Sequence, residues 1–243
     1  MNSYLRNIPP VTKNLLIINA MIWLVMILLP NGFDNKMVNY CGLYYAGSPL
    51  FQIWQPFTYM FLHSTQSITH LFFNMFALFM FGSALEQVFG QRRFLIFYVL
   101  VGIGAALVQE WVYFLRVDYL ERTYGLFMDA TSILGPMTTS QDIANEYFLL
   151  QFTPTVGASG AIYGILLAFG MLFPNMPMYL FFIPVPIKAK WMVIGYGVLE
   201  LVLGITGAQS SVAHFAHLGG MLVALMLIVL WRKQGKISRG PLY

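Results

Sequence analysis

Two residues of this chain have the types needed for nucleophilic catalysis, and each lies in an otherwise apolar stretch. Ser159 lies in the segment Gly157-Ala158-Ser159-Gly160, and His217 lies in Ala216-His217-Leu218-Gly219. A serine hydroxyl is a weak nucleophile until a neighbouring imidazole accepts its proton. Ser159 and His217 are therefore a candidate nucleophile and general base for acyl transfer. The sequence offers this pair no evident acidic partner.

Further residues have types that would support such a pair. Acyl transfer requires donors aimed at the developing oxyanion, and His70, Asn74 and the backbone N–H of Ser159 are candidates. His70 and Asn74 are spaced to share one face of a helix, and Tyr163 has an aromatic face and a hydroxyl with which to orient His217. Glycines would let the two helices that carry the pair approach closely. These are Gly157, Gly160, Gly164, Gly219 and Gly220.

The composition indicates that these residues lie in a membrane protein. Of the 243 residues, 58% are hydrophobic and only 9% are charged, and the mean hydropathy is +0.69. A soluble globular protein is typically about 25% charged, so the solvent of this chain must be largely lipid. Its net charge of +4 comes from short basic clusters beside apolar runs, a pattern typical of membrane topology and not of nucleic-acid binding. The single cysteine, Cys41, excludes an intrachain disulfide framework and a multi-cysteine metal site.

Six apolar segments are predicted to span the membrane, drawing on flanking residues where they fall short of the roughly 20 residues that a span needs. They are Leu15–Leu29, His70–Phe89, Phe94–Leu115, Ser159–Phe173, Trp191–Ile205 and Ala213–Trp231. With six spans, only Lys36, Arg116 and Arg122 among the basic residues fall on one side. Because cytoplasmic loops are enriched in Lys and Arg, both termini are expected in the cytoplasm.

The predicted fold class is an all-α membrane protein, a six-transmembrane-helix bundle whose first outer loop is re-entrant and half-submerged. Residues 1–13 would be a short cytoplasmic tail, 14–232 the membrane domain and 233–243 a basic cytoplasmic tail. The first span is expected to be a retained anchor, because no small-residue cleavage site follows it. In the outer loop 116–155, Asp142 is the expected cap of a helix Ile143–Phe152.

Residue counts along the predicted helices give the depth of each polar group. Ser159 and His217 lie about 22 Å, and Asn74 about 24 Å, above the cytoplasmic ends of their helices. The three groups therefore share one level, with His70 a turn nearer the outer face. Glu110 and Glu200 are expected to lie outside this level, as buried acids with partners that the sequence does not identify. His214 is expected to be structural.

With these motifs in order, the chain resembles the rhomboid family of intramembrane serine proteases. The resemblance rests on His70-x-x-x-Asn74, Gly157-Ala158-Ser159-Gly160, Tyr163 and Ala216-His217-Leu218-Gly219, and it covers roughly residues 14–232. It implies that Ser159 is the nucleophile and His217 the general base, with His70 and Asn74 at the oxyanion. It also implies substrates that are membrane proteins, cut in or near a transmembrane segment, and it implies no cofactor.

Two features depart from the family pattern. Trp54 is followed by Gln55, where the family commonly carries Trp-Arg, and the loop 116–155 is longer than in compact bacterial members. The role of the missing arginine, which we take as structural, must be absent or met by other residues. His63 and Glu86 occupy places that resemble family positions, and both are assigned to structure.

The sequence thus predicts an intramembrane serine endopeptidase of the cell membrane, with its active site opening to the outer side. Its expected partners are single-span membrane protein substrates and the lipid bilayer, with no nucleic acid and no metal site. A rhomboid-like protein that binds membrane clients without cleaving them is the main alternative. A metalloprotease is disfavoured because no His-Glu-x-x-His signature is present, and a transporter because no internal repeat is visible.

Overall fold

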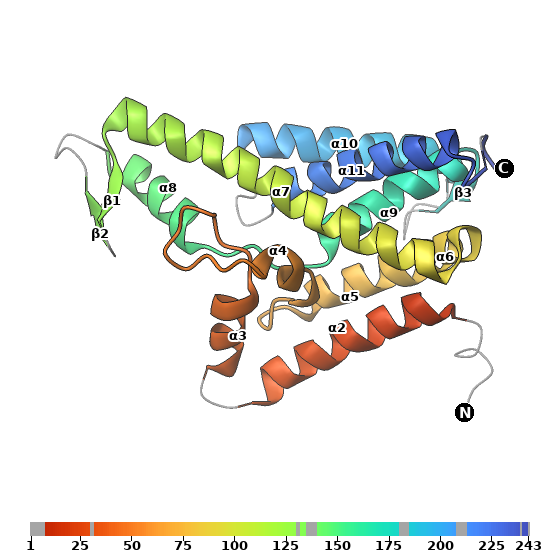
Figure 1. Cartoon of the computed structure of the whole chain (residues 1–243), viewed down its shortest axis with the longest axis horizontal. Coiled ribbons are helices and arrows are strands. Elements are labelled where there is room, and N and C mark those ends of the chain that lie inside the picture. The colour runs from red at the N-terminus through yellow and green to blue at the C-terminus, as the bar shows by residue number, and fades with distance from the viewer. Residues whose placement is uncertain are drawn as a thin grey trace.

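The fold is taken from a computed structural model that describes residues 8–29, 32–129, 132–134, 140–179, 185–207, 213–238 and 240–242. The two expected tails and the loop before the last helix fall partly outside these ranges, at residues 1–7, 239, 243 and 208–212. The described residues form a bundle of helices with two short antiparallel strand pairs (Figure 1).

The elements follow one another with short connections over most of the chain. In order they are α2 (Pro10–Leu28), α3 (Phe33–Cys41), α4 (Gln55–Thr58), the 3₁₀-helix η1 (Tyr59–Phe61), α5 (Ile68–Ala77), the π-helix η2 (Leu78–Gly82), α6 (Ser83–Phe89), α7 (Gln91–Tyr124), β1 (Phe127–Asp129), β2 (Ser132–Leu134), α8 (Gln141–Phe152), α9 (Ser159–Leu172), β3 (Pro177–Met178), β4 (Ile187–Lys188), α10 (Ala189–Thr206) and α11 (His214–Lys233). Strand β1 pairs with β2, and β3 with β4.

Each of the six predicted spanning segments corresponds to a helix, with only the terminal residues Leu29, Phe173 and Ala213 falling outside the helix bounds. Among the described residues, five helices are long and apolar enough to cross a membrane: α2, the continuous Ile68–Phe89, α7, α10 and α11. The remaining one, α9, is apolar but has only 14 residues. The chain is therefore a mostly helical membrane protein with five candidate spans, and a sixth span through α9 remains a proposal.

Helix α7 differs most from its predicted bounds. It was expected to end at Leu115, yet it continues to Tyr124 and stops at Gly125, whose φ of +65° gives a left-handed cap. The predicted loop 116–155 thus begins as helix and continues through the hairpin β1–β2 into α8. Arg116 on α7 pairs with both carboxylate oxygens of Glu146 on α8, at 2.5 and 2.7 Å.

The expected cap of α8 was wrong. Ser140, and not Asp142, caps the helix, because the Ser140 backbone is extended and its Oγ accepts the N–H of Ile143 at 3.4 Å. Asp142 lies in the first turn, where its negative charge interacts favourably with the positive end of the helix dipole.

The helix ends that carry most of the basic residues gather at one end of the bundle. Figure 1 places the starts of α2, α7 and α10 and the ends of α6, α9 and α11 there. Basic residues flank these ends: Lys13, Arg92, Arg93, Lys188, Lys190, Arg232 and Lys233. Glu86 of α6 stabilises the same end, because its carboxylate accepts the N–H groups of Val11 and Thr12, at 2.9 and 2.7 Å, and the Thr12 hydroxyl. These bonds satisfy orphan donors in the first turn of α2.

Helix α11 lies against α9 and α7, and α10 packs on α11 and α9. Glycines bring α9 and α11 together. A Cβ on Gly220 would lie 1.9 Å from the carbonyl oxygen of Gly160, and one on Gly164 would lie 2.8 Å from that of Gly220. Gly219 instead faces Val108 of α7. The close approach predicted from the glycines is confirmed for Gly160, Gly164 and Gly220.

Candidate active site

The segment before α9 is held in place by the segment between α3 and α5. Leu43 and Thr155 exchange two backbone hydrogen bonds of 2.9 and 2.8 Å, and the N–H of Gly157 donates to the carbonyl of Tyr59 at 3.0 Å. Gly157 has a φ of +132°, and a Cβ there would lie 2.9 Å from Nε2 of His70. Only glycine suits this position, and it directs the chain so that α9 begins at Ser159.

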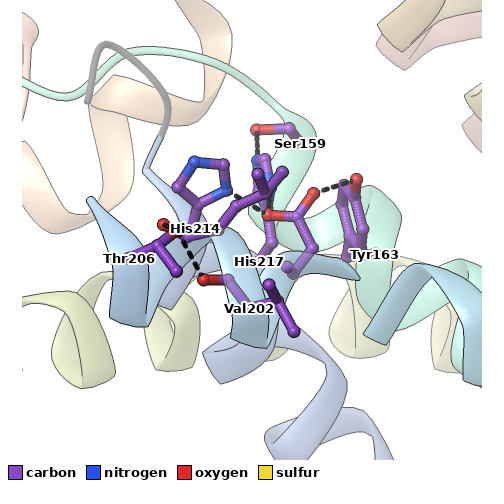
Figure 2. Close-up of polar contacts among 8 residues, drawn as sticks. Ser159, Tyr163, Val202, Thr206, His214 and His217 are labelled. Carbon is purple, nitrogen blue, oxygen red and sulfur yellow. Dashed lines mark hydrogen bonds and ion pairs between the residues drawn. The ribbon is translucent and has the colours of Figure 1, made fainter. Parts of the chain in front are cut away.

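The structure brings the two predicted reactive side chains into contact. Nε2 of His217 on α11 lies 2.8 Å from Oγ of Ser159 on α9, as Figure 2 shows. His217 is buried, and Ser159 is half-buried. The contact has the length of a hydrogen bond from a serine hydroxyl to an imidazole nitrogen, which is the geometry that proton transfer from a nucleophile requires.

Tyr163 lies against the same imidazole. Its ring stacks on that of His217 with centroids 4.1 Å apart and planes 7° apart. The hydroxyl, which the sequence offered as a second means of orienting His217, instead donates to Oε1 of Glu200 on α10. The tyrosine therefore contacts the histidine through its face and the glutamate through its hydroxyl.

The expectation that Glu200 lies outside the level of Ser159 and His217 was wrong. Its Oε2 lies 2.6 Å from Nδ1 of His214 and 3.0 Å from Nδ1 of His217. The first of these contacts is a hydrogen bond, whereas the N–H of His217 is not aligned on the oxygen and its Nδ1 lacks a well-formed hydrogen bond. Glu200 is only 5% exposed, so the carboxylate, both imidazoles and the Tyr163 hydroxyl form one buried polar cluster.

His70 and Asn74 both lie on α5, whereas Ser159 and His217 lie on α9 and α11. Nδ1 of His70 accepts the N–H of Ser64 at 3.3 Å, so a neutral ring carries its hydrogen on Nε2, next to Gly157. Asn74 donates one amide hydrogen to the carbonyl of His70 at 2.8 Å. The ring of His63, fully buried in the connection between η1 and α5, packs beside that of His70. Burial, with the neighbouring His70 as a second cause, lowers the pKa of His63 to about 3, so His63 is uncharged near neutral pH.

Five of the candidate site residues line one cavity of about 880 Å³. Ser159, His217, His70, Asn74 and Tyr163 all line it. Away from them its lining is mainly apolar and comes from α5, η2, α9 and α10, with Phe76, Met80, Leu166, Met192 and Tyr196 among its members. A hydroxyl, an imidazole and potential oxyanion donors thus face one space large enough for a peptide segment.

Comparison with known proteins identifies the fold family. The profile of the Rhomboid domain matches residues 50–234. The chain belongs to the rhomboid family. It is 26% identical to Rhomboid protease AarA of Providencia stuartii over 233 residues, which cover 90% of this chain and 72% of AarA.

Mitochondrial rhomboids are also similar to this chain. RHOMBOID-like protein 12 of Arabidopsis thaliana is 33% identical over 68% of this chain, and Rhomboid protein 1 of Saccharomyces cerevisiae is 29% identical over 67% of it. The matched segments span 43% and 38% of those two proteins, so this chain covers less than half of their length.

The glutamine that replaces the arginine typical of rhomboids has a structural place in this chain. Gln55 is fully buried, and it links two parts of the segment between α3 and α4: its Oε1 accepts the N–H of Tyr44 at 3.3 Å, and its Nε2 donates to the carbonyl of Leu50 at 3.0 Å. A neutral side chain thus ties together the loop that holds the segment before Ser159.

The buried polar cluster around Glu200 includes the residues best placed to hold a metal ion in the described part of the chain. One ligand atom each from Glu200, His214 and His217 lies within 4.8 Å of the others. Two ligands on one tetrahedral zinc, each about 2.0–2.1 Å from it, would be roughly 3.3 Å apart. The contacts of 2.6 and 3.0 Å are both shorter than this, and the first is a hydrogen bond between His214 and Glu200, so the geometry fits a protein hydrogen bond better than a shared ion.

Proposed function

We propose that this rhomboid is an intramembrane serine endopeptidase that cleaves membrane proteins in or near a transmembrane segment. The observation that carries the proposal is the contact of 2.8 Å between Ser159 and His217, which faces a cavity among apolar helices. The family adds support, since AarA is named a rhomboid protease. Ser159 would be the nucleophile and His217 the general base.

The reaction follows from these two groups. Oγ of Ser159 attacks the scissile carbonyl carbon as its proton passes to Nε2 of His217, and the π pair of the carbonyl moves onto its oxygen. When the carbonyl re-forms, the C–N bond breaks and His217 returns the proton to the leaving nitrogen. A water molecule then repeats the attack on the acyl-enzyme, with His217 again as base, and releases Ser159.

His70, Asn74 and the backbone N–H of Ser159 would stabilise the oxyanion. The Ser159 N–H lies in the first turn of α9, where helix geometry leaves donors unpaired. Asn74 has a second amide hydrogen beyond the one that it gives to His70. Nε2 of His70 lies beside Gly157, two residues before the nucleophile. Two of these donors thus come from α5, and the third comes from the start of α9.

We propose six spans, with α9 the shortest, and both termini on the cytoplasmic side of the cell membrane. Residues 1–13 and 233–243 would then be cytoplasmic tails around a membrane domain 14–232. The gathering of basic residues at one end of the bundle supports this orientation. Ser159 lies at the opposite end of α9 from that basic end, so the site would open to the outer side, beneath a half-submerged first outer loop.

Single-span membrane proteins are the proposed substrates. The apolar part of the cavity lies between α5 and α10, where a transmembrane segment would leave the lipid and unwind next to Ser159. The decisive experiment treats the purified protein with a fluorophosphonate probe, which phosphonylates an activated serine. Labelling that disappears in Ser159→Ala supports the protease. A wild-type chain that is neither labelled nor active on any single-span substrate in proteoliposomes would instead favour the client-binding alternative.

A further inference from the structure

A buried carboxylate contacts the side of His217 that faces away from Ser159. Nε2 of His217 lies 2.8 Å from Oγ of Ser159, and Nδ1 of the same ring lies 3.0 Å from Oε2 of Glu200. The carboxylate comes from α10, whereas the nucleophile and base lie on α9 and α11. The order serine, imidazole, carboxylate is that of a catalytic triad, which is recognised by geometry and not by chain order.

The surroundings of Glu200 fix which atoms carry protons. The Tyr163 hydroxyl donates to Oε1, and Nδ1 of His214 lies 2.6 Å from Oε2. An ionised carboxylate can only accept hydrogen bonds, so beside it each Nδ1 carries a hydrogen. A neutral His217 then has its lone pair on Nε2, directed at the Ser159 hydroxyl. This is the tautomer that a general base needs.

We propose that Glu200 is a positioning residue that extends the Ser159–His217 pair to a Ser-His-Glu triad, a role that rests on the proposed protease function. As His217 takes the serine proton it becomes an imidazolium, and the adjacent carboxylate stabilises that charge in a buried site. The proton on Nδ1 stays on the imidazole, and Glu200 is ionised throughout. The misaligned N–H of His217 belongs to the substrate-free enzyme, in which such bonds are often poorly aligned.

His214 and Tyr163 hold the carboxylate in place. Each donates to one of its oxygens, from α11 and from α9, so Glu200 is bonded to both helices that carry the reactive pair. A buried carboxylate with such donors has a defined orientation, as the partner of a catalytic histidine requires. His214, expected to be structural, thus acts on the site through Glu200.

The test compares Glu200→Gln with Glu110→Gln, a matched neutralisation on α7 outside the cavity. Glu110 is half-buried and accepts one backbone N–H, that of Ala46 at 2.6 Å. Both amides keep the shape and an acceptor oxygen, so the two variants differ in where a negative charge is lost. We measure three quantities for each: kcat and KM on a single-span substrate in proteoliposomes, the second-order rate of fluorophosphonate labelling, and Tm.

For Glu200→Gln we expect kcat and the labelling rate to fall together by about 10²-fold, with KM and Tm nearly unchanged. Loss of a triad carboxylate costs about 10⁴-fold in other serine proteases, and the smaller value reflects the Tyr163 ring, which still fixes the plane of His217. Glu110→Gln should retain wild-type rates. A role confined to helix packing predicts a lower Tm with unchanged labelling, and a role confined to substrate entry predicts slower cleavage with unchanged labelling.

Either of those two patterns would overturn the triad while leaving the protease intact. So would wild-type rates in Glu200→Gln. Absence of labelling and cleavage in the wild-type chain would overturn the protease function and the triad with it. The two failures are therefore distinguishable from the same set of measurements.

Discussion

The seams on the two sides of the candidate site are packed in opposite ways. Between α9 and α11, the backbones nearly touch at Gly160 and Gly220, and α9 buries 10 of its 14 residues and α11 eight of its 20. Between α5 and α10, large side chains such as Phe76 and Met192 line a cavity. Helix α10 buries few residues, with Ala189, Met192, Val193 and Glu200 its buried members.

This difference suggests that the α9–α11 seam serves the chemical step and that the α5–α10 seam serves substrate entry. Close backbone packing leaves the α9–α11 seam little room to move, which suits a nucleophile and base that must stay about 3 Å apart. Helix α10 buries few of its residues, so we expect that opening the α5–α10 seam costs less free energy. We therefore expect changes at the first seam to act on the chemical step and changes at the second to act on substrate entry.

The largest effect is expected from the nucleophile itself. Ser159→Ala should abolish both fluorophosphonate labelling and cleavage while Tm stays near the wild-type value, because a half-buried hydroxyl is replaced by a methyl group. Chelators should leave wild-type activity unchanged, since no step of the proposed reaction uses a metal. Activity in Ser159→Ala, or its loss on chelation, would contradict the assignment and return the Glu200, His214 and His217 cluster to consideration as a metal site.

Asn74→Ala should give the next largest effect. Loss of one oxyanion donor typically lowers kcat by about 10²–10³-fold, or roughly 2.7–4 kcal/mol, with KM nearly unchanged. A helix-linking asparagine would contribute only about 0.6 kcal/mol to stability. The hydrogen bond that Asn74 makes stays within its own helix, which argues for the first role. Steady-state kinetics and a melting curve decide, and a clear fall in Tm with kcat retained would make Asn74 structural.

Gly220→Ala should widen the rigid seam. The new methyl group would lie 1.9 Å from the Gly160 carbonyl oxygen, so α9 and α11 must separate. A displacement of about 1 Å at the reacting groups can lower the rate about 10²-fold, and overpacking costs about 1–3 kcal/mol of stability. We expect lower labelling and a lower Tm together. Gly195→Ala on α10, where a Cβ meets nothing within 4 Å, is the control and should resemble wild type.

The sequence predicted the apolar helices and the pairing of Ser159 with His217 because both have local signals, and the structure places the two side chains in contact. Apolar runs predicted each candidate spanning helix, and the equal predicted depth of a serine and a histidine indicated that Ser159 and His217 form a pair. The polar residues after Leu115 were read as the end of a helix, although the stop signal is Gly125, where φ is +65°. Polarity ends a membrane span, but it does not end a helix that continues into water.

Glu200 was missed because a residue count cannot place side chains across helices. Ten residues separate it from Lys190, or about 15 Å of helix against the roughly 22 Å for His217. A residue count assumes that every helix is perpendicular to the membrane, and it gives the depth of the backbone only. It includes neither the tilt of α10 nor the length and direction of the glutamate side chain. One signal was available in the sequence: a carboxylate in an apolar helix is costly in free energy unless it has polar partners. In the structure, Tyr163 and two histidines are those partners.

The smallest and most selective effect is expected from the α5–α10 seam. Phe76 on α5 and Met192 on α10 line the same cavity, so cysteines at both positions, in a Cys41→Ser background, can be joined by a bifunctional thiol reagent. A substrate helix is about 10 Å wide with its side chains and cannot pass a closed seam, whereas a small probe reaches Ser159 from the water side. We expect cleavage of a single-span substrate to fall about tenfold or more when entry is blocked, while fluorophosphonate labelling keeps its wild-type rate. Each single-cysteine variant treated with the same reagent is the control. If labelling and cleavage fell equally, the bridge would be acting on the chemical step, and the division between a rigid catalytic seam and an opening substrate seam would be wrong.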